Sequence, residues 1–119
     1  AGDVIGLEVN MRPCGGFTPD MINYARNTNV YKIWADMIAY GSSLYPVGEH
    51  NFCICAGRWD CKRYTQDHTA ILHKYAGNLR IVERVPGALA GAMGNQMYVA
   101  CFSAKAQLDE FCKDIMDCE

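Results

Sequence analysis

Seven cysteines are the residues of this 119-residue chain with the most distinctive chemistry. Thiols at this density are typical of proteins that fold in an oxidising compartment, where disulfides form and persist. We therefore predict about three disulfides, which use six of the seven cysteines and leave one thiol over. The spacing leaves the pairing open among Cys14, Cys53, Cys55, Cys61, Cys101, Cys112 and Cys118.

Local geometry favours some of these pairings over others. Cys53 and Cys55 alternate along a predicted strand and therefore lie on one face of it. If the hairpin predicted below has a loop of about three residues, Cys53 faces Cys61. Cys112 lies on the apolar face of the last helix, which favours a partner in the sheet. Cys14 and Cys118 lie near segment ends, where a disulfide would restrain fraying.

Metal binding is the alternative use of the cysteine cluster, because His50, Cys53, Cys55 and Cys61 are ligand types that zinc prefers. A single residue separates Cys53 from Cys55. Zinc ribbons and knuckles typically place about two to four residues between paired ligands. No second pair of matching spacing follows, so we predict no metal and no cofactor.

Catalysis would require a base beside a nucleophile or beside a second acid. The three histidines, His50, His68 and His73, are the candidate bases, and Asp67 is next to one of them. The motifs of known hydrolases, phosphate-binding loops and calcium loops do not occur in the sequence. We therefore assign no catalytic residue and interpret the histidines as surface or capping residues.

Two segments have side chains suited to binding. The first runs from Arg58 to Arg84 and interleaves basic residues with Trp59, Tyr64 and Tyr75, although its small surplus of charge also fits an ordinary solvated surface. The second is the Gly- and Ala-rich stretch 86–94, predicted as a long loop that presents Leu89 and Met93 as adaptable apolar contacts. The same loop could instead cover the core.

The elements that position these residues follow from hydrophobic periodicity and capping signals. Thr18 and Pro19 begin a helix that runs to Gly41, and Asn27-Thr28-Asn29 is a point at which it can divide. The remaining pattern predicts a strand at 4–11, a hairpin formed by 52–55 and 59–64, a helix at 65–75, strands at 79–83 and 97–102, and a helix at 108–116 behind a Ser103 cap.

This order predicts a single α+β domain over residues 1–119. We expect one antiparallel-rich sheet with helices mainly on one face, stapled by disulfides. The first six predicted elements also follow the split β-α-β plan of ferredoxin-like folds. The strand at 97–102 is nearly all apolar, so we place it in the centre of the sheet.

Composition excludes several classes of protein. Half of the residues are hydrophobic and only 20% are charged, which excludes a disordered chain. A net charge of −2 argues against a nucleic-acid binder that depends on a basic surface. No apolar stretch reaches the roughly 18 residues that a transmembrane helix needs. The start at Ala1-Gly2-Asp3 fits a secreted chain whose signal peptide has been removed.

A chain of this length with many cysteines, no catalytic motif and an α+β core resembles the small cysteine-rich effector and killer-toxin proteins of fungi. The odd seventh cysteine departs from their usual even count. The resemblance implies a secreted, non-enzymatic protein that binds a protein or cell-surface target of another organism. Two alternatives stay open: a periplasmic inhibitor or immunity protein that neutralises a partner enzyme, and a small secreted hydrolase.

Overall fold

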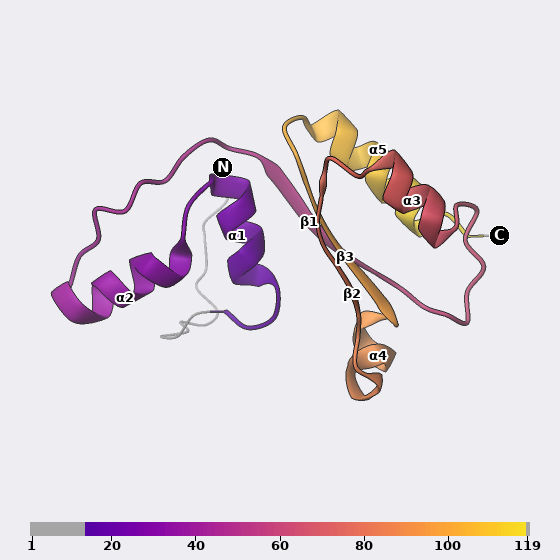
Figure 1. Cartoon of the computed structure of the whole chain (residues 1–119), viewed down its shortest axis with the longest axis horizontal. Helices are drawn as coiled ribbons and strands as arrows, with labels where there is room; N and C mark the ends of the chain where they lie inside the picture. The colour runs from indigo at the N-terminus through magenta and orange to yellow at the C-terminus, as the bar shows by residue number, and fades with distance from the viewer. Residues whose placement is uncertain (1–13, 119) are drawn as a thin grey trace, which may run out of the picture.

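The computed structural model describes residues 14–118 of the chain (Figure 1). The strand predicted at residues 4–11 lies outside the described residues. In chain order the described elements are α1 (Thr18–Arg26), α2 (Val30–Tyr40), β1 (Phe52–Arg58), α3 (His68–Lys74), β2 (Leu79–Arg84), α4 (Gly87–Met93), β3 (Gln96–Phe102) and α5 (Lys105–Met116).

The strands form one three-stranded antiparallel sheet in the order β1-β3-β2. Because β1 and β2 both run antiparallel to β3, they are parallel to each other, and α3 connects them. This is the split β-α-β arrangement, with β3 filling the gap. The predicted α+β class is confirmed, and the split unit seen within the described residues consists of β1, α3 and β2.

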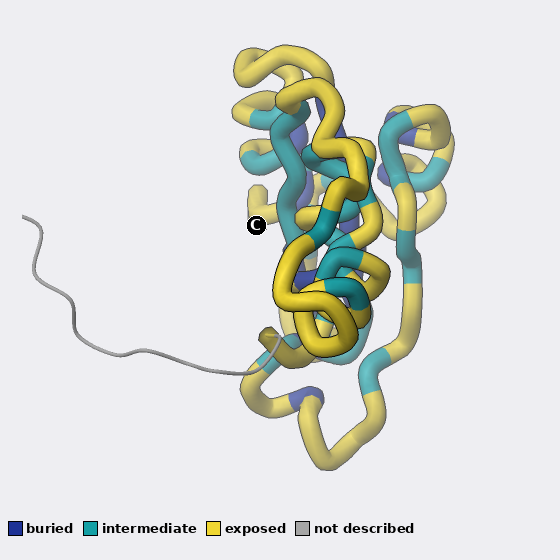
Figure 2. Tube along the Cα trace, turned by 90° about the vertical axis from the view of Figure 1, so that its left-hand side faces the viewer, coloured by how far each residue is buried: buried dark blue, intermediate teal, exposed yellow. Residues whose placement is uncertain are grey.

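The core lies between the sheet and the helices α3 and α5. The central strand β3 is buried from Met97 to Phe102, as its apolar run predicts. The Phe111 ring of α5 packs edge-on against the Tyr75 ring with the centroids 4.9 Å apart, and lies 5.4 Å from the Phe102 ring. The buried residues lie mainly in β3 and on the facing sides of α3 and α5, and Figure 2 shows that most of the remaining chain is intermediate or exposed.

The other face of the sheet is covered by α1, which packs against β1 and β3. The Sγ atom of Cys101 on β3 lies 3.5 Å from the Tyr24 carbonyl oxygen of α1. On this face the sheet presents sulfur-bearing side chains, because Cys53, Cys55, Met97 and Cys101 all occupy alternate positions of β1 and β3. Figure 1 shows α1 and α2 on one side of the sheet and α3 and α5 on the other, so helices flank both faces and not mainly one face as predicted.

The predicted N-terminal helix divides at the expected point. Asn27 ends α1 in the left-handed conformation with φ of 41°, and the Asn29 side chain caps α2 by accepting from the Lys32 N–H at 3.0 Å. Gly41, with φ of 70°, ends α2 as predicted. None of the residues of α2 is buried. Its apolar stripe therefore packs against α1 and covers little else of the molecule.

The hairpin predicted over residues 52–64 is wrong. The segment 52–58 is a strand, but it pairs with β3, and residues 59–67 form an irregular loop. Cys53 therefore lies opposite Cys101 instead of Cys61. Trp59 and Tyr64 suit a strand by propensity, but Tyr64 instead places its ring over the guanidinium of Arg58, 4.3 Å from centroid to Cζ.

The loop predicted at residues 86–94 is also wrong, because most of it forms α4. Pro86 precedes the helix, and its carbonyl accepts the Ala90 N–H at 3.1 Å. Ala and Leu are strong helix formers and outweigh the two glycines within the helix. Gly94 ends it with φ of 84°.

All seven cysteines lie within the described residues, and each is a free thiol in this structure. Which of them pair in an oxidising compartment therefore stays a prediction. Within residues 14–118, no helix combines the length and the apolar character needed to cross a membrane.

Candidate binding cleft

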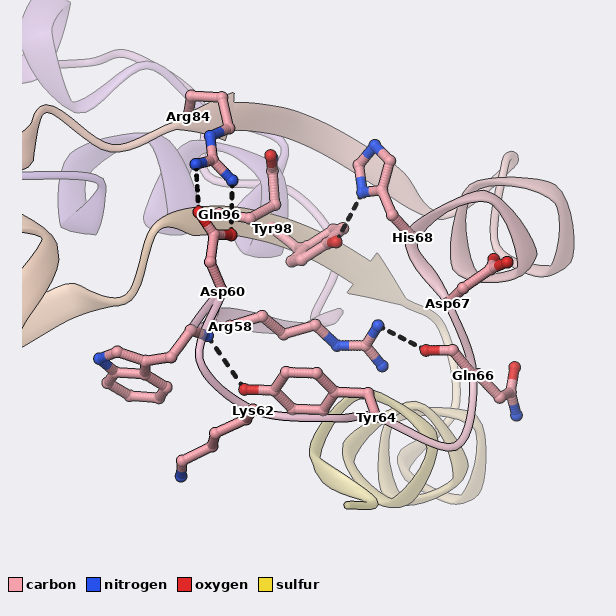
Figure 3. Close-up of a pocket in the computed structure, with 11 residues that line it drawn as sticks. Arg58, Asp60, Lys62, Tyr64, Gln66, Asp67, His68, Arg84, Gln96 and Tyr98 are labelled. Atoms are coloured by element: carbon pink, nitrogen blue, oxygen red, sulfur yellow. Dashed lines mark hydrogen bonds and ion pairs between the residues drawn. The ribbon is translucent and has the colours of Figure 1, made fainter. Parts of the chain in front are cut away.

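A cleft of about 740 Å³ opens at the end of the sheet where β1 and β2 finish and β3 begins (Figure 3). The strand register explains its position, because Arg58 of β1 and Arg84 of β2 both pair with Gln96 of β3 in one row across the sheet. We name it the Arg58 cleft. Its lining consists of Arg58, Trp59, Asp60, Lys62, Tyr64, Gln66, Asp67, His68, Arg84, Gln96 and Tyr98.

Arg58 forms the floor of this cleft and is only 5% exposed. Its guanidinium donates to three carbonyl oxygens: that of Ile115 at 2.8 Å, that of Gln66 at 2.7 Å and that of Asp114 at 3.0 Å. Two of these carbonyls lie in the last turn of α5, where the helix dipole favours a cation. Arg58 therefore joins β1, the 59–67 loop and α5, and its donors face inward.

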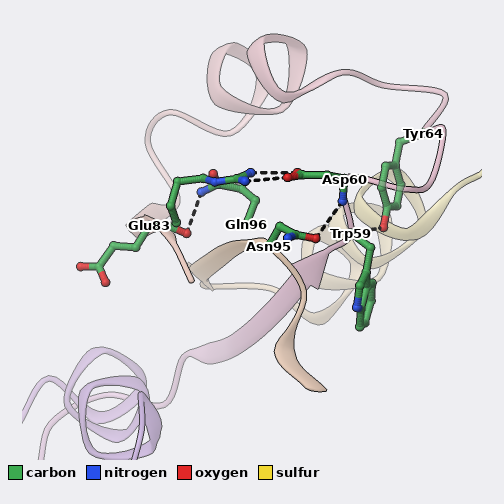
Figure 4. A network of polar contacts seen from close by, with 7 residues as sticks. Trp59, Asp60, Tyr64, Glu83, Asn95 and Gln96 are labelled. Carbon is green, nitrogen blue, oxygen red and sulfur yellow. Dashed lines mark hydrogen bonds and ion pairs between the residues drawn. The ribbon is translucent and has the colours of Figure 1, made fainter. Parts of the chain in front are cut away.

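The loop that forms one wall of the cleft is held by hydrogen bonds at its start. The Trp59 N–H donates to the Tyr64 hydroxyl at 3.0 Å, and the Asp60 N–H donates to the Asn95 side-chain oxygen at 3.0 Å (Figure 4). The Lys62 ammonium lies 5.0 Å from the centre of the Trp59 ring. The indole of Trp59 is thus presented at a fixed place on a partly exposed wall.

A bidentate ion pair forms the rim of the cleft. The Arg84 guanidinium donates to both carboxylate oxygens of Asp60, at 2.8 and 2.6 Å. These hydrogen bonds lower the pKa of Asp60, and they raise that of Arg84. Gln96 lies beside them and donates to the Glu83 carbonyl at 2.9 Å (Figure 4). The rim is therefore organised before any ligand arrives.

The opposite wall of the cleft contains a histidine and a tyrosine in contact. His68 Nδ1 and the Tyr98 hydroxyl are hydrogen-bonded at 2.7 Å. Burial raises the pKa of Tyr98, so its hydroxyl stays protonated at neutral pH. The neighbouring Asp67 caps α3 by accepting from the Ala70 N–H at 2.7 Å, so this helix begins at His68 and not at residue 65 as predicted. Its carboxylate is thus already engaged.

A second, smaller cavity of about 350 Å³ adjoins the first, and we name it the Leu89 hollow. Arg84 lines both cavities. Leu89 of α4 is 52% exposed there, and Met93 is partly buried. Its lining is completed by Gly16, Phe17, Asp20, Glu83, Val85 and Pro86.

Close backbone contact fixes α4 relative to the Arg58 cleft. The Asn95 N–H donates to the Arg58 carbonyl at 2.7 Å. A Cβ at Gly57 would overlap the Met93 carbonyl, and a Cβ at Gly94 would lie 2.8 Å from the Arg58 carbonyl oxygen. Only glycine allows the end of α4 to approach β1 so closely.

The structure places the four side chains that the sequence singled out for binding in two cavities that share Arg84. Arg58 and Trp59 line the Arg58 cleft, and Leu89 and Met93 line the adjoining hollow. His68 joins the cleft, whereas His50 and His73 do not line it. Sequence reasoning included Tyr64 and Arg84 in the basic and aromatic segment 58–84 without singling them out as binding residues. It missed Gln96 and Tyr98, because only the strand register places them beside Arg58.

Within the described residues, no three His, Cys, Asp or Glu side chains converge as a possible metal-binding group. Comparison of the chain with protein-family models, with curated proteins and with solved structures found no match.

Proposed function

We propose that this chain is a secreted, non-enzymatic protein that acts by binding a protein of another organism through the two cavities that share Arg84. The observation that carries the proposal is that Arg84 lines both cavities. Residues near position 58 and residues near position 89, which the sequence separates, therefore line two cavities that meet at this one arginine. We name the combined area the Arg84 surface.

The chemistry of the Arg84 surface suits a protein partner. Protein interfaces depend on a few aromatic and apolar anchors surrounded by polar groups. Here Trp59 and the half-exposed Leu89 offer such anchors. Lys62, exposed beside the Trp59 ring, would meet an acidic side chain of the partner. A partner segment with an apolar residue next to a carboxylate would complement both features.

The state of the carboxylates in the Arg58 cleft favours binding over acid-base chemistry. Asp60 is held by Arg84, and Asp67 caps α3. A general acid or base needs a carboxyl group or imidazole that is free to exchange a proton with substrate. The His68–Tyr98 pair is the remaining feature that a hydrolase could use, and no serine, threonine or cysteine is among the described residues that line the cleft.

The test is affinity capture from the extracellular fluid of a prospective host, with the full chain as bait and quantitative mass spectrometry as readout. The site variant combines Trp59→Ala with Leu89→Ser. The matched control combines Trp34→Ala with Leu44→Ser, which removes side chains of the same types that are 40% and 99% exposed elsewhere on the molecule.

We expect proteins enriched by the native chain to be captured at least about tenfold less by the site variant, a loss of roughly 1.4 kcal/mol in binding. The control variant should capture them as the native chain does. Equal capture by the site variant, or equal loss in both variants, would show that the Arg84 surface is not the binding site.

A further inference from the structure

The cysteines on the α1 side of the sheet include one pair placed for a covalent bond. Cys53 of the edge strand β1 lies directly opposite Cys101 of the central strand β3. Cys55 lies opposite Val99 instead, and its Sγ contacts the Met97 sulfur at 3.0 Å. Only Cys53 of the two cysteines in β1 therefore has a thiol as its cross-strand neighbour.

The hydrogen bonds of Cys101 identify the type of cross-strand pair. Its N–H donates to the Asn78 carbonyl at 2.9 Å, and its carbonyl accepts from the Asn78 side-chain amide at 3.0 Å. Both backbone groups of Cys101 thus point away from β1. Cys53 and Cys101 form a non-hydrogen-bonded pair, the type in which facing Cα atoms approach to about 4.5 Å and side chains are closest.

That separation falls within the range in which a disulfide can form. Disulfides join residues whose Cα atoms are about 4.4 to 6.8 Å apart and whose side chains point the same way. The side chains of Cys53 and Cys101 share the face of the sheet that α1 covers. Closing the bond needs side-chain rotation and no movement of either strand.

We propose that Cys53 and Cys101 form a disulfide that links the edge strand to the centre of the sheet, with an external disulfide as oxidant. The Cys53 thiolate attacks one sulfur of the oxidant, forming a mixed disulfide and releasing the first thiolate. The Cys101 thiolate then attacks the Cys53 sulfur and releases the second thiolate. The protons lost by Cys53 and Cys101 end on the two released thiols, and the oxidant gains two electrons.

Cys53 is the more accessible of the two thiols, so we expect it to attack the oxidant first. It lines a surface cavity of about 350 Å³ between α1 and β1, bounded by Met21, Ala25 and Asn51, whereas Cys101 is only 6% exposed. Burial and the neighbouring Cys101 thiol raise the pKa of Cys53 to about 11. Since only the thiolate reacts, closure should be slow at pH 7 and roughly tenfold faster at pH 8.

The bond is independent of the proposed binding function. Neither Cys53 nor Cys101 lines the Arg58 cleft or the Leu89 hollow. A failure of the capture experiment would leave this inference intact, and a failure here would leave the Arg84 surface intact.

The experiment incubates the reduced full chain with oxidised glutathione at pH 8, then alkylates the remaining thiols under denaturing conditions and digests with trypsin. Cleavage at Lys32, Arg58, Arg84 and Lys105 yields peptide 33–58, which contains Cys53 and Cys55, and peptide 85–105, which contains Cys101. We expect these two peptides to appear joined in mass spectra and separate after reduction.

Two variants decide which cysteine of peptide 33–58 is used. The joined pair should persist in Cys55→Ser, the matched control on the same face of β1, and disappear in Cys53→Ser. The inference is overturned if Cys101 is alkylated in full, if it is joined to a different peptide, or if Cys55→Ser removes the joined pair and Cys53→Ser keeps it.

Discussion

Arg58 is a cation held inside the protein by backbone carbonyls instead of by a carboxylate. All three of its acceptors are carbonyl oxygens, and its guanidinium lies 4.3 Å from the centre of the Tyr64 ring. Only a planar group with several fixed donors can satisfy this arrangement, since the acceptors come from a loop and from a helix end. The arginine therefore organises the Arg58 cleft from below, and a ligand would meet the residues around it.

Replacing Arg58 with lysine tests this role. An ammonium group cannot reach carbonyls of Gln66, Asp114 and Ile115 together, so buried acceptors would lose their donors. We expect Arg58→Lys to lower the free energy of unfolding by about 2 to 4 kcal/mol, measured by urea denaturation. The control is Arg80→Lys on the exposed edge of β2, which should change it by less than about 0.5 kcal/mol. If both variants had the same free energy of unfolding, the hydrogen bonds of Arg58 would not contribute to stability as proposed.

At the scale of elements, α3 and α5 are joined by a polar contact at the edge of the core. Tyr75 donates to the Asp114 carboxylate at 2.7 Å, and the Lys74 ammonium contacts both Asp114 and Glu110 at 2.7 Å. Burial alone would raise the pKa of Asp114, but hydrogen bonds from Lys74, Tyr75 and Gln66 outweigh it, and the pKa is lowered. The contact therefore depends on an ionised carboxylate.

The variant Tyr75→Phe removes one of these hydrogen bonds and keeps the aromatic packing on Phe111. A carboxyl group whose pKa is lowered by folding adds stability above its unfolded pKa of about 4, and this stability is lost as the pH falls through the folded pKa. We expect Tyr75→Phe to cost about 1 to 2 kcal/mol at pH 7 and clearly less near pH 2. Urea denaturation at both pH values measures this, with Tyr40→Phe, 78% exposed, as control. A cost independent of pH would refute the role of the Asp114 charge.

Elements that a single local pattern determines could be predicted from the sequence. The apolar run of β3 and the three-and-four spacing of Leu108, Phe111 and Ile115 in α5 both reflect burial of a whole strand or a helix face. The errors arose where a tertiary contact decided the outcome. Tyr64 was predicted to lie in a strand, but its ring covers the Arg58 guanidinium instead. Gly57 and Gly94 allow α4 to approach β1 closely, whereas the glycines of this region were expected to form a flexible loop.

The candidate site was predictable to the same limited degree. Residue type alone drew attention to Arg58, Trp59, Leu89 and Met93, because aromatic, basic and exposed apolar side chains are common at interfaces. Nothing in the sequence indicates that Arg84 lines both the cavity of Arg58 and Trp59 and the cavity of Leu89 and Met93. That position follows from the register of β2 on β3, a long-range choice that depends on which strand lies in the centre.

At the scale of the whole molecule, the described chain divides into two parts. One is the packed sheet with its helices, and the other is a helical arm formed by α2, which has fewer supporting contacts. The radius of gyration is 16.9 Å, whereas a compact chain of this length has about 13 to 14 Å. Figure 1 shows α2 apart from the sheet, and none of its residues is buried. The segment that follows returns along α1, where the Gly48 N–H donates to the Arg26 carbonyl and the Asn51 N–H to the Ala25 carbonyl, both at 2.8 Å.

This asymmetry predicts where a protease cuts first. Residues 41–45 connect α2 to the anchored segment without regular structure, and the side chains of Tyr40 and Leu44 are 78% and 99% exposed. Within residues 14–118, we expect brief chymotrypsin treatment to cleave after Tyr40 or Leu44 before it cleaves after Tyr75 or Phe111, because cleavage at buried residues requires the core to open. The bond after Tyr45 is protected because Pro46 follows it. Mass spectrometry of the first fragments measures the order.

The cut should leave the Arg58 cleft intact, because the bonds of Gly48 and Asn51 hold the downstream chain on α1 and β1 begins at Phe52. Nicked protein should therefore unfold in urea at nearly the midpoint of the uncut chain. Leu44→Ser should slow cleavage at that position without shifting the midpoint. A first cut after Phe111, or a nicked protein that unfolds at a much lower urea concentration, would mean that α2 supports the sheet and that the arm is not a separable part of the fold.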